Sequence, residues 1–360
     1  MSLHAVLRRR VSSTFQIDVD IEVPPGITIL FGPSGSGKTG ILRCIAGLSR
    51  PDAGRISLDE TVLFDRQAAI DLPPQQRRVG LVFQQLALFP HLTVAANIEY
   101  GLRGLPQDER TRRLASIAES FHIADILPRY PGQTSGGERQ RTALARALVM
   151  EPSALLLDEP LTALDYRIQS RIIDDLRRWN EARRIPMLYV THAHREVYAL
   201  GDRMIVMDQG RVVATGTPHE VLDSPRTLLV AALAGFENLL SGRVTHRRED
   251  TGTMLVRLDD SDVDLEVPLT ESAGNGVTVA IRAGDILVAV APPLGISARN
   301  VIEGTIDTLN REGPTIVARV NAGVTVVVHL TPASAEELHL CHGSQVWLII
   351  KTYSCRIATA

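Results

Sequence analysis

Hydrophobic and polar residues follow two different patterns along the 360-residue chain. Up to about Gly235, short β-branched runs alternate with longer stretches of helical periodicity, which indicates an α/β fold. The short runs predict strands at Ile27–Phe31, Val79–Phe83, Ala154–Leu157, Met187–Thr191 and Arg203–Met207. The longer stretches predict helices at Thr39–Gly47, Gln107–Phe121, Gly136–Val149 and Arg167–Glu181.

The pattern changes beyond Asn238, where valine, threonine, isoleucine and glycine dominate. Apolar and polar residues alternate in Met254–Val267 and Thr315–Leu330, and this period of two predicts strands with one buried face. One short helix is expected near Ala333–Leu338. The C-terminal part of the chain is therefore predicted to be all-β.

Two parts of the β region resemble each other. Leu240–Val244 is similar to Ile302–Ile306, and Gly276–Arg282 is similar to Gly343–Lys351. A repeat of this length indicates two related structural units, so we expect two small barrel-like units in tandem. The expected domains are residues 1–235, a first β repeat over 236–291, and a second β domain over 292–360.

Charge and cysteine content narrow the class of protein. The formal net charge is −3, which argues against a nucleic-acid binder. Three cysteines are too few for a disulfide scaffold and fit a reducing compartment. There is no run of about 18 apolar residues, and no apolar segment follows the N-terminal arginines, so we expect neither a membrane span nor a secretory signal. Among the 38 basic residues, only Lys38 and Lys351 are lysine.

A phosphate-binding loop follows the first predicted strand. Its residues are Gly32, Pro33, Ser34, Gly35, Ser36, Gly37, Lys38 and Thr39, and they match the pattern G-x-x-x-x-G-K-[ST]. Glycines let backbone N–H groups converge on phosphate oxygens, and the following helix start adds partial positive charge. Lys38 is expected to reach the β and γ phosphates, and the Thr39 hydroxyl is expected to bind Mg²⁺.

Two acids follow the buried run Ala154–Leu157. Ligands bind at the carboxyl ends of strands in open α/β sheets, so Asp158 and Glu159 are expected near the phosphate loop. Asp158 is predicted to hold Mg²⁺, which prefers carboxylate oxygens and keeps some of its waters. Glu159 is predicted to polarise the water that attacks the γ-phosphate.

A third motif decides the class of protein. Ser135, Gly136 and Gly137 open a predicted helix, and the turn resembles the L-S-G-G-Q signature of ATP-binding cassette (ABC) proteins. Thr134 and Glu138 depart from that signature. The resemblance spans roughly residues 15–225 and implies further roles: Gln84 as the Q-loop glutamine that also faces the metal, Asp165 as the D-loop acid, and His192 as the switch histidine.

The family also implies ATP, Mg²⁺ and a homodimer, in which Ser135–Gly137 of one chain complete the site around the ATP held by the other. An aromatic residue usually stacks on adenine upstream of the phosphate loop. The sequence leaves this position unassigned: Arg10 offers a flat guanidinium, whereas Phe15 is interpreted as a strand core residue. A small-molecule kinase fits poorly, because the signature turn and His192 would have no role.

The region Val82–Val94 resembles the import ATPases that carry a C-terminal β domain. Its apolar stretch Leu86–Leu92 indicates a partner surface, because an exposed apolar patch often binds another protein. The resemblance implies that this surface docks on an integral-membrane permease. The open alternative is burial against the helical subdomain.

The tail carries a clue to the cargo. Ile296–Val301 resembles the S-A-R-N signature of molybdate-binding Mop domains, and Ile350–Thr352 resembles their I-K-[ST] strand. A tetrahedral dianion needs hydroxyl and backbone donors with balancing cations. The resemblance implies an oxyanion site at Ser297, Ala298, Arg299, Asn300, Lys351 and Thr352. The alternative is that Arg299 and Lys351 are ordinary charges that protect strand edges.

Together these resemblances imply an α/β P-loop ABC ATPase domain with a helical subdomain, followed by an all-β OB-like Mop/TOBE domain. They place the chain with the ATPase subunits of molybdate importers (the ModC family). We expect it at the cytoplasmic face of the inner membrane, as a peripheral subunit of a permease supplied by a substrate-binding protein. The tail is expected to sense molybdate and inhibit transport. The alternatives are an importer for tungstate, sulfate or sugar, and a soluble ATP-switched protein for molybdate storage or regulation.

Overall fold

The computed structural model describes residues 1–162, 164–270 and 274–358, and the chain divides between Pro218 and His219 into two compact units. This division lies earlier in the chain than the boundary expected after residue 235. The segment between the two positions contains α7 (Pro218–Leu222) and α8 (Leu228–Leu233), and α8 packs against the first strand of the second unit.

The first unit is built on two sheets. The antiparallel sheet has the order β2-β1-β4-β5-β6 and contains β1 (Leu3–Arg10), β2 (Gln16–Val23), β4 (Ala53–Leu58), β5 (Thr61–Asp65) and β6 (Ile70–Asp71). The mainly parallel sheet has the order β11-β10-β3-β9-β8-β7 and contains β3 (Gly26–Phe31), β7 (Val79–Val82), β8 (Ala154–Asp158), β9 (Pro186–Val190), β10 (Arg203–Asp208) and β11 (Arg211–Gly216). The five strands predicted from short apolar runs all lie in this second sheet.

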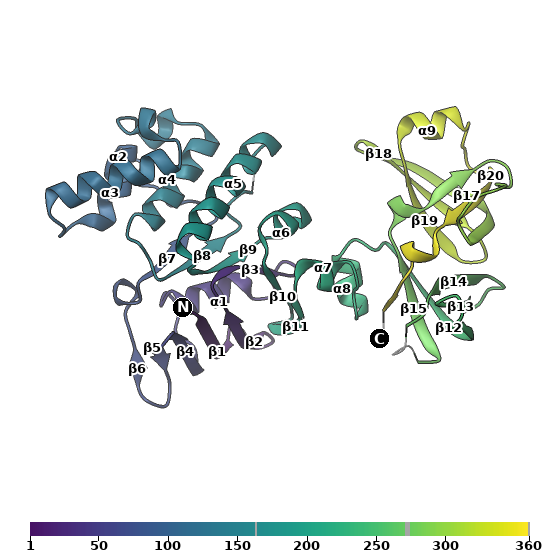
Figure 1. Ribbon diagram of the computed structural model, residues 1–360, viewed down its shortest axis with the longest axis horizontal. Helices are drawn as coiled ribbons and strands as arrows, with labels where there is room; N and C mark the ends of the chain where they lie inside the picture. The colour runs from purple at the N-terminus through teal and green to yellow at the C-terminus, as the bar shows by residue number, and fades with distance from the viewer. Residues whose placement is uncertain (163, 271–273, 359–360) are drawn as a thin grey trace. The chain divides into compact units, whose positions relative to one another are not determined.

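The helices of the first unit lie against the parallel sheet or pack on helices that do so (Figure 1). They are α1 (Lys38–Ile45), α2 (Val94–Glu99), α3 (Gln107–Ser120), α4 (Gly136–Leu148), α5 (Tyr166–Arg183) and α6 (His194–Leu200). Helix α1 lies between the two sheets, because Ile41, Leu42 and Ile45 share one core with residues of both. Helices α2, α3 and α4 pack on one another and form the expected helical subdomain. In the described ranges, no helix combines the length and apolar character needed to cross a membrane.

The second unit contains two five-stranded sheets. The first has the order β14-β13-β12-β15-β21 and contains β12 (Asn238–Arg248), β13 (Thr253–Leu258), β14 (Asp264–Pro268), β15 (Gly276–Ile281) and β21 (Arg356–Ala358). The second has the order β16-β20-β17-β18-β19 and contains β16 (Leu287–Ala289), β17 (Asn300–Glu312), β18 (Thr315–Asn321), β19 (Thr325–Leu330) and β20 (Gln345–Ile350). The expected short helix is α9 (Pro332–Glu337).

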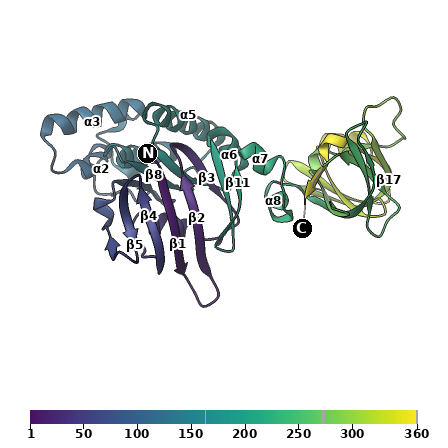
Figure 2. The ribbon, with the colours of Figure 1, turned by 60° about the horizontal axis from the view of Figure 1, so that its bottom comes forward.

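The strands of the two expected repeats follow the same order in their two sheets, but the two repeats do not form separate barrels. Strand β16 follows the first repeat in sequence and pairs with β20 of the second, whereas β21 ends the second repeat and pairs with β15 of the first. Each sheet therefore takes its fifth strand from the other repeat. Buried side chains of both repeats, such as Val279 and Leu348, belong to one hydrophobic core. Figure 2 shows the strands of both repeats curled into one unit.

Candidate functional site

The phosphate loop connects β3 to α1. Gly32 and Gly37 have φ angles of 148° and 104°, which favour glycine. A Cβ on Gly32 would lie 2.2 Å from the Met207 carbonyl oxygen, so no larger residue fits. Gly37 caps α1 without a side-chain hydrogen bond, and the first N–H groups of the helix can therefore face an anion.

Lys38 is buried inside this loop, and its Nζ donates to the carbonyl oxygens of Gly32 and Pro33 at 2.9 and 2.8 Å. Burial lowers the pKa of Lys38, while the nearby carboxylates of Glu159 and Asp158 raise it in part. The ammonium group is held where phosphates would lie, and a phosphate can replace the two carbonyl acceptors.

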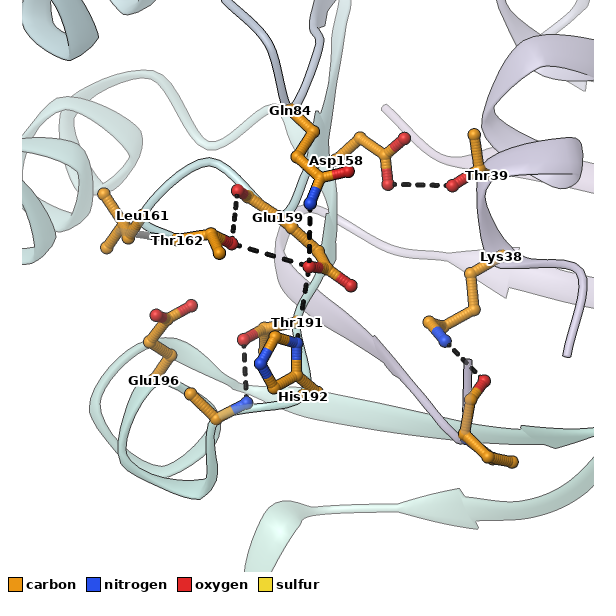
Figure 3. A network of polar contacts seen from close by, with 12 residues as sticks. Lys38, Thr39, Gln84, Asp158, Glu159, Leu161, Thr162, Thr191, His192 and Glu196 are labelled. Carbon is orange, nitrogen blue, oxygen red and sulfur yellow. Dashed lines mark hydrogen bonds and ion pairs between the residues drawn. The ribbon is translucent and has the colours of Figure 1, made fainter. Parts of the chain in front are cut away.

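Asp158 lies at the carboxyl end of β8, beside the loop. The Thr39 hydroxyl donates to Asp158 Oδ1 at 3.1 Å (Figure 3). Burial raises the pKa of Asp158 and the adjacent Glu159 adds to the shift, whereas the Thr39 hydrogen bond and the Lys38 charge lower this pKa in part. A hydroxyl and one carboxylate match the protein ligands that Mg²⁺ usually takes beside nucleotide phosphates.

Glu159 brings the predicted catalytic residues together. Its Oε2 accepts from Gln84 Nε2 at 3.4 Å and lies 3.4 Å from His192 Nδ1 (Figure 3). Its backbone has a φ of 45°, and its N–H donates to the Val190 carbonyl at the end of β9. The three side chains come from the ends of β7, β8 and β9, so the parallel sheet gathers them at one edge.

The signature turn starts α4 with a capping box. Ser135 Oγ and N both donate to Glu138 Oε2, at 2.8 and 2.7 Å, and Glu138 N donates back to Ser135 Oγ at 3.3 Å. These hydrogen bonds lower the pKa of Glu138. Gly137 packs against the start of α5, where a Cβ would lie 2.5 Å from Ile168 Cγ2.

Asp165 is the N-cap of α5, and its Oδ1 accepts from Arg167 N and Ile168 N at 3.0 Å. The signature turn and Asp165 thus meet the same helix start, because a Cβ on Gly136 would lie 3.3 Å from Leu164 Cδ2. In the described part of the chain, no hydrogen bond or ion pair joins this group to Lys38, Asp158 or Glu159. The nucleotide site of one chain therefore contains the loop and acidic pair, with the signature turn separate.

Phe15 lies beside the phosphate loop, where its Cζ would be 3.4 Å from a Cβ on Gly37. It is half-buried and packs against the core, as expected for a strand core residue, although β2 starts one residue later. Arg10 is exposed at the end of β1. Position relative to the loop therefore makes Phe15 a stronger adenine-stacking candidate than Arg10, which the sequence alone did not indicate.

A second group of predicted residues lines one open pocket in the β unit. Ser297, Arg299, Lys351 and Thr352 line it together with Arg248, Thr251, Thr253, Glu266 and Tyr353. Sequence patterns did not indicate the residues from β12, β13 and β14, because they are distant in the chain. Arg248 forms an ion pair with Glu266 at 3.3 Å.

Two predicted oxyanion residues do not line this pocket. Asn300 is buried, its Oδ1 accepts from Glu266 N at 2.7 Å, and its Nδ2 donates to Glu266 O at 2.9 Å. Both ends of its amide are used within the fold, so the structure gives Asn300 a structural role. Ala298 has an apolar side chain and is half-buried outside the lining residues.

The phosphate loop, the acidic pair and the signature turn on this parallel sheet define an ABC-type ATPase. The "ABC transporter" family model matches residues 17–162, and the "TOBE domain" model matches residues 296–357. The dimeric ATP-binding cassette MJ0796, solved with ADP and Pi, is 28% identical with a TM-score of 0.52, covering 61% of this chain and 99% of that one.

Curated relatives match nearly the whole chain. The "Molybdenum import ATP-binding protein ModC" of Mesorhizobium japonicum is 37% identical over 98% of this chain and 96% of its own. The protein of the same name from Paramagnetospirillum magneticum is 39% identical over 96% of this chain and 95% of its own. The chain therefore belongs to the ModC family of ABC transporter ATPases.

Proposed function

We propose that this chain powers molybdate import through separate integral-membrane permease subunits, with a substrate-binding protein that delivers the oxyanion. The observation that carries the proposal is the combination, in one chain, of an ABC ATP site and a pocket lined by Arg299, Lys351 and five residues with hydroxyl groups. The name of the relatives supports molybdenum as the cargo.

The ATP site supports a division of roles. Lys38 binds the β and γ phosphates, and its three N–H donors exchange the loop carbonyls for phosphate oxygens. Thr39, Asp158 and Gln84 hold Mg²⁺, which neutralises charge on the phosphates when it is bound. The raised pKa of Asp158 supports this assignment, because a bound cation would favour the ionised form that burial disfavours.

Glu159 is the proposed general base for the attacking water. Gln84 and His192 both contact its Oε2, so they orient the carboxylate and face the same water position. Because Oε2 already has these two neighbours, Oε1 is the oxygen that remains to accept a proton from water. His192 is exposed and can reach the γ-phosphate side of the site.

A homodimer completes the site in this proposal. The signature turn of one chain lies apart from its own Lys38, whereas an ATP-bound site needs donors on the open side of the γ-phosphate. Ser135, Gly136 and Gly137 of the second chain supply backbone and hydroxyl donors there. ATP then stabilises the closed dimer, and hydrolysis shifts the population to the open state.

The segment Leu86–Leu92 is the proposed docking surface for the permease. Leu86, Leu88, Phe89 and Leu92 are half-buried, and Pro90 and His91 are exposed. The stretch is therefore neither a full core segment nor a free loop. It follows Gln84 directly, so movement of the docked permease would reach the contact between Gln84 and Glu159.

The β unit is proposed to bind molybdate and inhibit transport at high cytoplasmic concentration. Lys351 and Arg299 provide cationic charge in the pocket, and Ser297 and Thr352 provide hydroxyl donors. Lys38 and Lys351, the two lysines of the chain, thus serve tetrahedral oxyanions. A compact ammonium differs from a flat guanidinium, so Lys351→Arg should weaken the oxyanion site.

Equilibrium dialysis of the full chain against sodium molybdate, tungstate and sulfate tests the cargo. We expect saturable binding of molybdate that falls at least tenfold in Lys351→Ala and Arg299→Ala, with ATPase activity retained. Arg311→Ala removes an exposed cation of the same unit and serves as the control. Stronger binding of tungstate or sulfate than of molybdate would change the cargo, and binding of none of the three would favour a sugar or a structural tail.

Uptake of radioactive molybdate by a host strain that lacks the chain tests the import role. The wild-type chain should restore uptake, Lys38→Arg should not, and Lys351→Ala should restore uptake that excess molybdate no longer inhibits. Co-purification with membrane permease subunits would place the protein at the cytoplasmic face of the membrane. Recovery of a soluble molybdate-loaded chain without such partners would favour the storage or regulatory alternative.

A further inference from the structure

Each β repeat contains a position that is structurally equivalent to a position in the other repeat. Only the position in the second repeat has the residues of an anion site. Equivalence follows from strand register, because Asn300 pairs with Ile350 and Asn238 pairs with Ile281 in matching ladders. The residues that follow these partners, Lys351 and Arg282, therefore correspond to each other. Likewise Arg299 and Glu237 correspond, because each precedes the paired asparagine.

The rest of the pocket can be matched through the same ladders. Arg248 pairs with Thr253 across the first hairpin, and Asn310 pairs with Val317 across the second. The register thus gives six pairs of corresponding residues: Arg248 with Asn310, Thr253 with Val317, Ser297 with Gly235, Arg299 with Glu237, Lys351 with Arg282, and Thr352 with Ala283. Among these six pairs, the position in the first repeat lacks three hydroxyl groups and has a carboxylate where the second has a guanidinium. The carboxylate of the second position, Glu266, is paired with Arg248 and corresponds by register to Val327.

That carboxylate is already bound. Glu237 Oε2 accepts from Ala283 N at 2.8 Å. The equivalent donor in the second repeat is the N–H of Thr352, a residue that is only 8% exposed. Among residues 1–162, 164–270 and 274–358, no hydrogen-bond acceptor for the Thr352 N–H is found. In the first repeat, the Glu237 carboxylate thus accepts the hydrogen bond of the Ala283 N–H. In the second repeat, the equivalent Thr352 N–H has no acceptor from the part of the chain that the structure describes, and it follows Lys351.

The cation of the first position is engaged as well. The Arg282 guanidinium lies 4.7 Å from the centre of the Phe236 ring, and its Nη2 is 3.5 Å from Asp223 Oδ1. An external oxyanion there would meet the Glu237 charge, and the matched residues Val317, Gly235 and Ala283 would offer it no hydroxyl donor. The side chains of Lys351 and Arg299 have no hydrogen bond or ion pair within the described ranges, so their charges remain available to a ligand.

We infer that Glu237 is a built-in anion that closes the first position, and that the β unit takes one oxyanion, at the second position. This inference rests on the proposed anion-binding function of the β unit. It assigns Glu237 as the residue that sets the number of sites. It also places the ligand in the open pocket, where one oxygen of the oxyanion accepts from the Thr352 N–H. This hydrogen bond is equivalent to the one that the Glu237 carboxylate accepts from the Ala283 N–H.

Exchange of these features between the repeats tests the inference by equilibrium dialysis of the full chain with sodium molybdate. The wild type should bind one molybdate per chain. Arg299→Glu copies the first repeat into the second and should reduce binding to zero. Glu237→Ser should add a second site about tenfold weaker than the first, because fewer hydroxyls bind the ligand. Glu237→Gln retains an acceptor for the Ala283 N–H, so this variant should still bind one molybdate per chain.

The double variant Arg299→Glu/Glu237→Ser separates this inference from the proposed function. It should bind one molybdate at the opened first position, whereas Arg299→Glu/Glu303→Ser, which removes an exposed carboxylate, should bind none. Two molybdates per wild-type chain would overturn the inference. So would a Glu237→Ser chain with native Trp347 fluorescence that gains no site. If the wild type binds no oxyanion, the proposed tail function fails, and a gain on Glu237→Ser still supports closure by Glu237.

Discussion

Asn238 and Asn300 make the same pair of hydrogen bonds, each to the backbone of the other β repeat. Asn238 accepts from Val327 N at 2.7 Å and donates to Val327 O at 2.8 Å. Asn300 accepts from Glu266 N at 2.7 Å and donates to Glu266 O at 2.9 Å. Both side chains are buried, and each joins the start of a long strand to an edge strand of the partner repeat. The amides therefore fix how the two sheets meet.

Asn238→Ala and Asn300→Ala should each lower the free energy of unfolding of the β unit by about 3 kcal/mol, because each loses its two hydrogen bonds to the edge strand of the other repeat and leaves two backbone groups without these partners. Urea unfolding followed by Trp347 fluorescence, in a Trp179→Phe background, measures this change. The exposed Asn310→Ala should shift stability by less than about 0.5 kcal/mol. A similar small shift in the buried variants would show that the amides do not hold the repeats together.

Glu138 in the signature turn should weaken the response to ATP. Its carboxylate binds the Ser135 hydroxyl and N–H, the donors that the proposed dimer aims at the γ-phosphate. Glu138→Gln removes a like charge, and the half-saturating ATP concentration for hydrolysis should fall about threefold to fivefold. Steady-state phosphate release measures it, with the exposed Glu119→Gln as the control. An unchanged or higher ATP requirement would contradict this role.

The same contact predicts a pH effect on folding. The Ser135 hydrogen bonds lower the pKa of Glu138 below its unfolded value, so their stabilisation is present above that unfolded pKa. It is lost as the pH falls through the lower folded pKa. Wild type and Glu138→Gln should therefore converge in stability in the acid range and differ near neutral pH, which urea unfolding at a series of pH values measures.

Local sequence patterns were sufficient to predict the parallel sheet and the functional residues at the carboxyl ends of its strands. Strands such as Ala154–Asp158 are fully buried and read as continuous apolar runs, and ligands gather at their carboxyl ends. The antiparallel sheet was not predicted, although the residues of β2 alternate and bury Ile17, Val19 and Ile21. This sheet needs pairing between β1 and β4, which local sequence does not specify.

The β unit shows where sequence patterns stop being informative. The repeat was visible, but pairing of Thr278 with Ala358 joins residues far apart in the chain, and hydrophobic periodicity carries no information about such partners. For the same reason Asn300 was assigned to the oxyanion site with its motif neighbours. Its bond to Glu266 depends on a fold in which a distant strand returns beside it.

Arg146 should hold the loop that follows Gln84. From α4 it donates to the carbonyl oxygens of Leu86 and Ala87, both at 2.7 Å, and these two residues have φ angles of 58° and 47°. Such angles are costly for residues with a Cβ, so the loop needs an external restraint. Burial lowers the pKa of Arg146, which is consistent with a charge enclosed by this loop.

Arg146→Met should increase chymotrypsin cleavage between Phe83 and Phe89 about tenfold, because two charge-assisted hydrogen bonds no longer oppose local opening. Mass spectrometry of timed digests measures the rate. Arg139→Met, an exposed substitution on the same helix, should leave cleavage within about twofold of the wild type. Equal rates in the two variants would show that the loop keeps its conformation without Arg146.

The three thiols should differ sharply in reactivity. Cys44 and Cys355 are buried and Cys341 is exposed. Burial raises the pKa of Cys44, and it raises the pKa of Cys355 to about 12, so little reactive thiolate forms near neutral pH. At pH 8 a disulfide reagent should modify Cys341 about 100-fold faster than the others, and Cys341→Ser should remove the fast phase.

The buried thiols also predict a loss of stability in alkali. A raised thiol pKa contributes stability that is fully present below the unfolded pKa of about 8.5 and is lost as the pH rises through the folded pKa. Cys355→Ala should therefore flatten the fall in stability above that unfolded value, as measured by urea unfolding. If Cys355 reacts as fast as Cys341 in the native protein, its enclosure in the β core is wrong.

Glu159→Gln should bind ATP but lose hydrolysis by about 100-fold or more, because the amide cannot accept the proton of the attacking water. Gln84 and His192 keep a neighbour of similar shape, and Lys38, Thr39 and Asp158 are untouched, so the ATP affinity should remain. In the proposed dimer the uncleaved nucleotide then holds two chains together, and light scattering with ATP should give twice the monomer mass. The exposed Glu181→Gln should hydrolyse ATP at the wild-type rate and not accumulate as a dimer. Unchanged hydrolysis in Glu159→Gln would exclude Glu159 as the base, and lost hydrolysis without a dimer would exclude the sandwich arrangement.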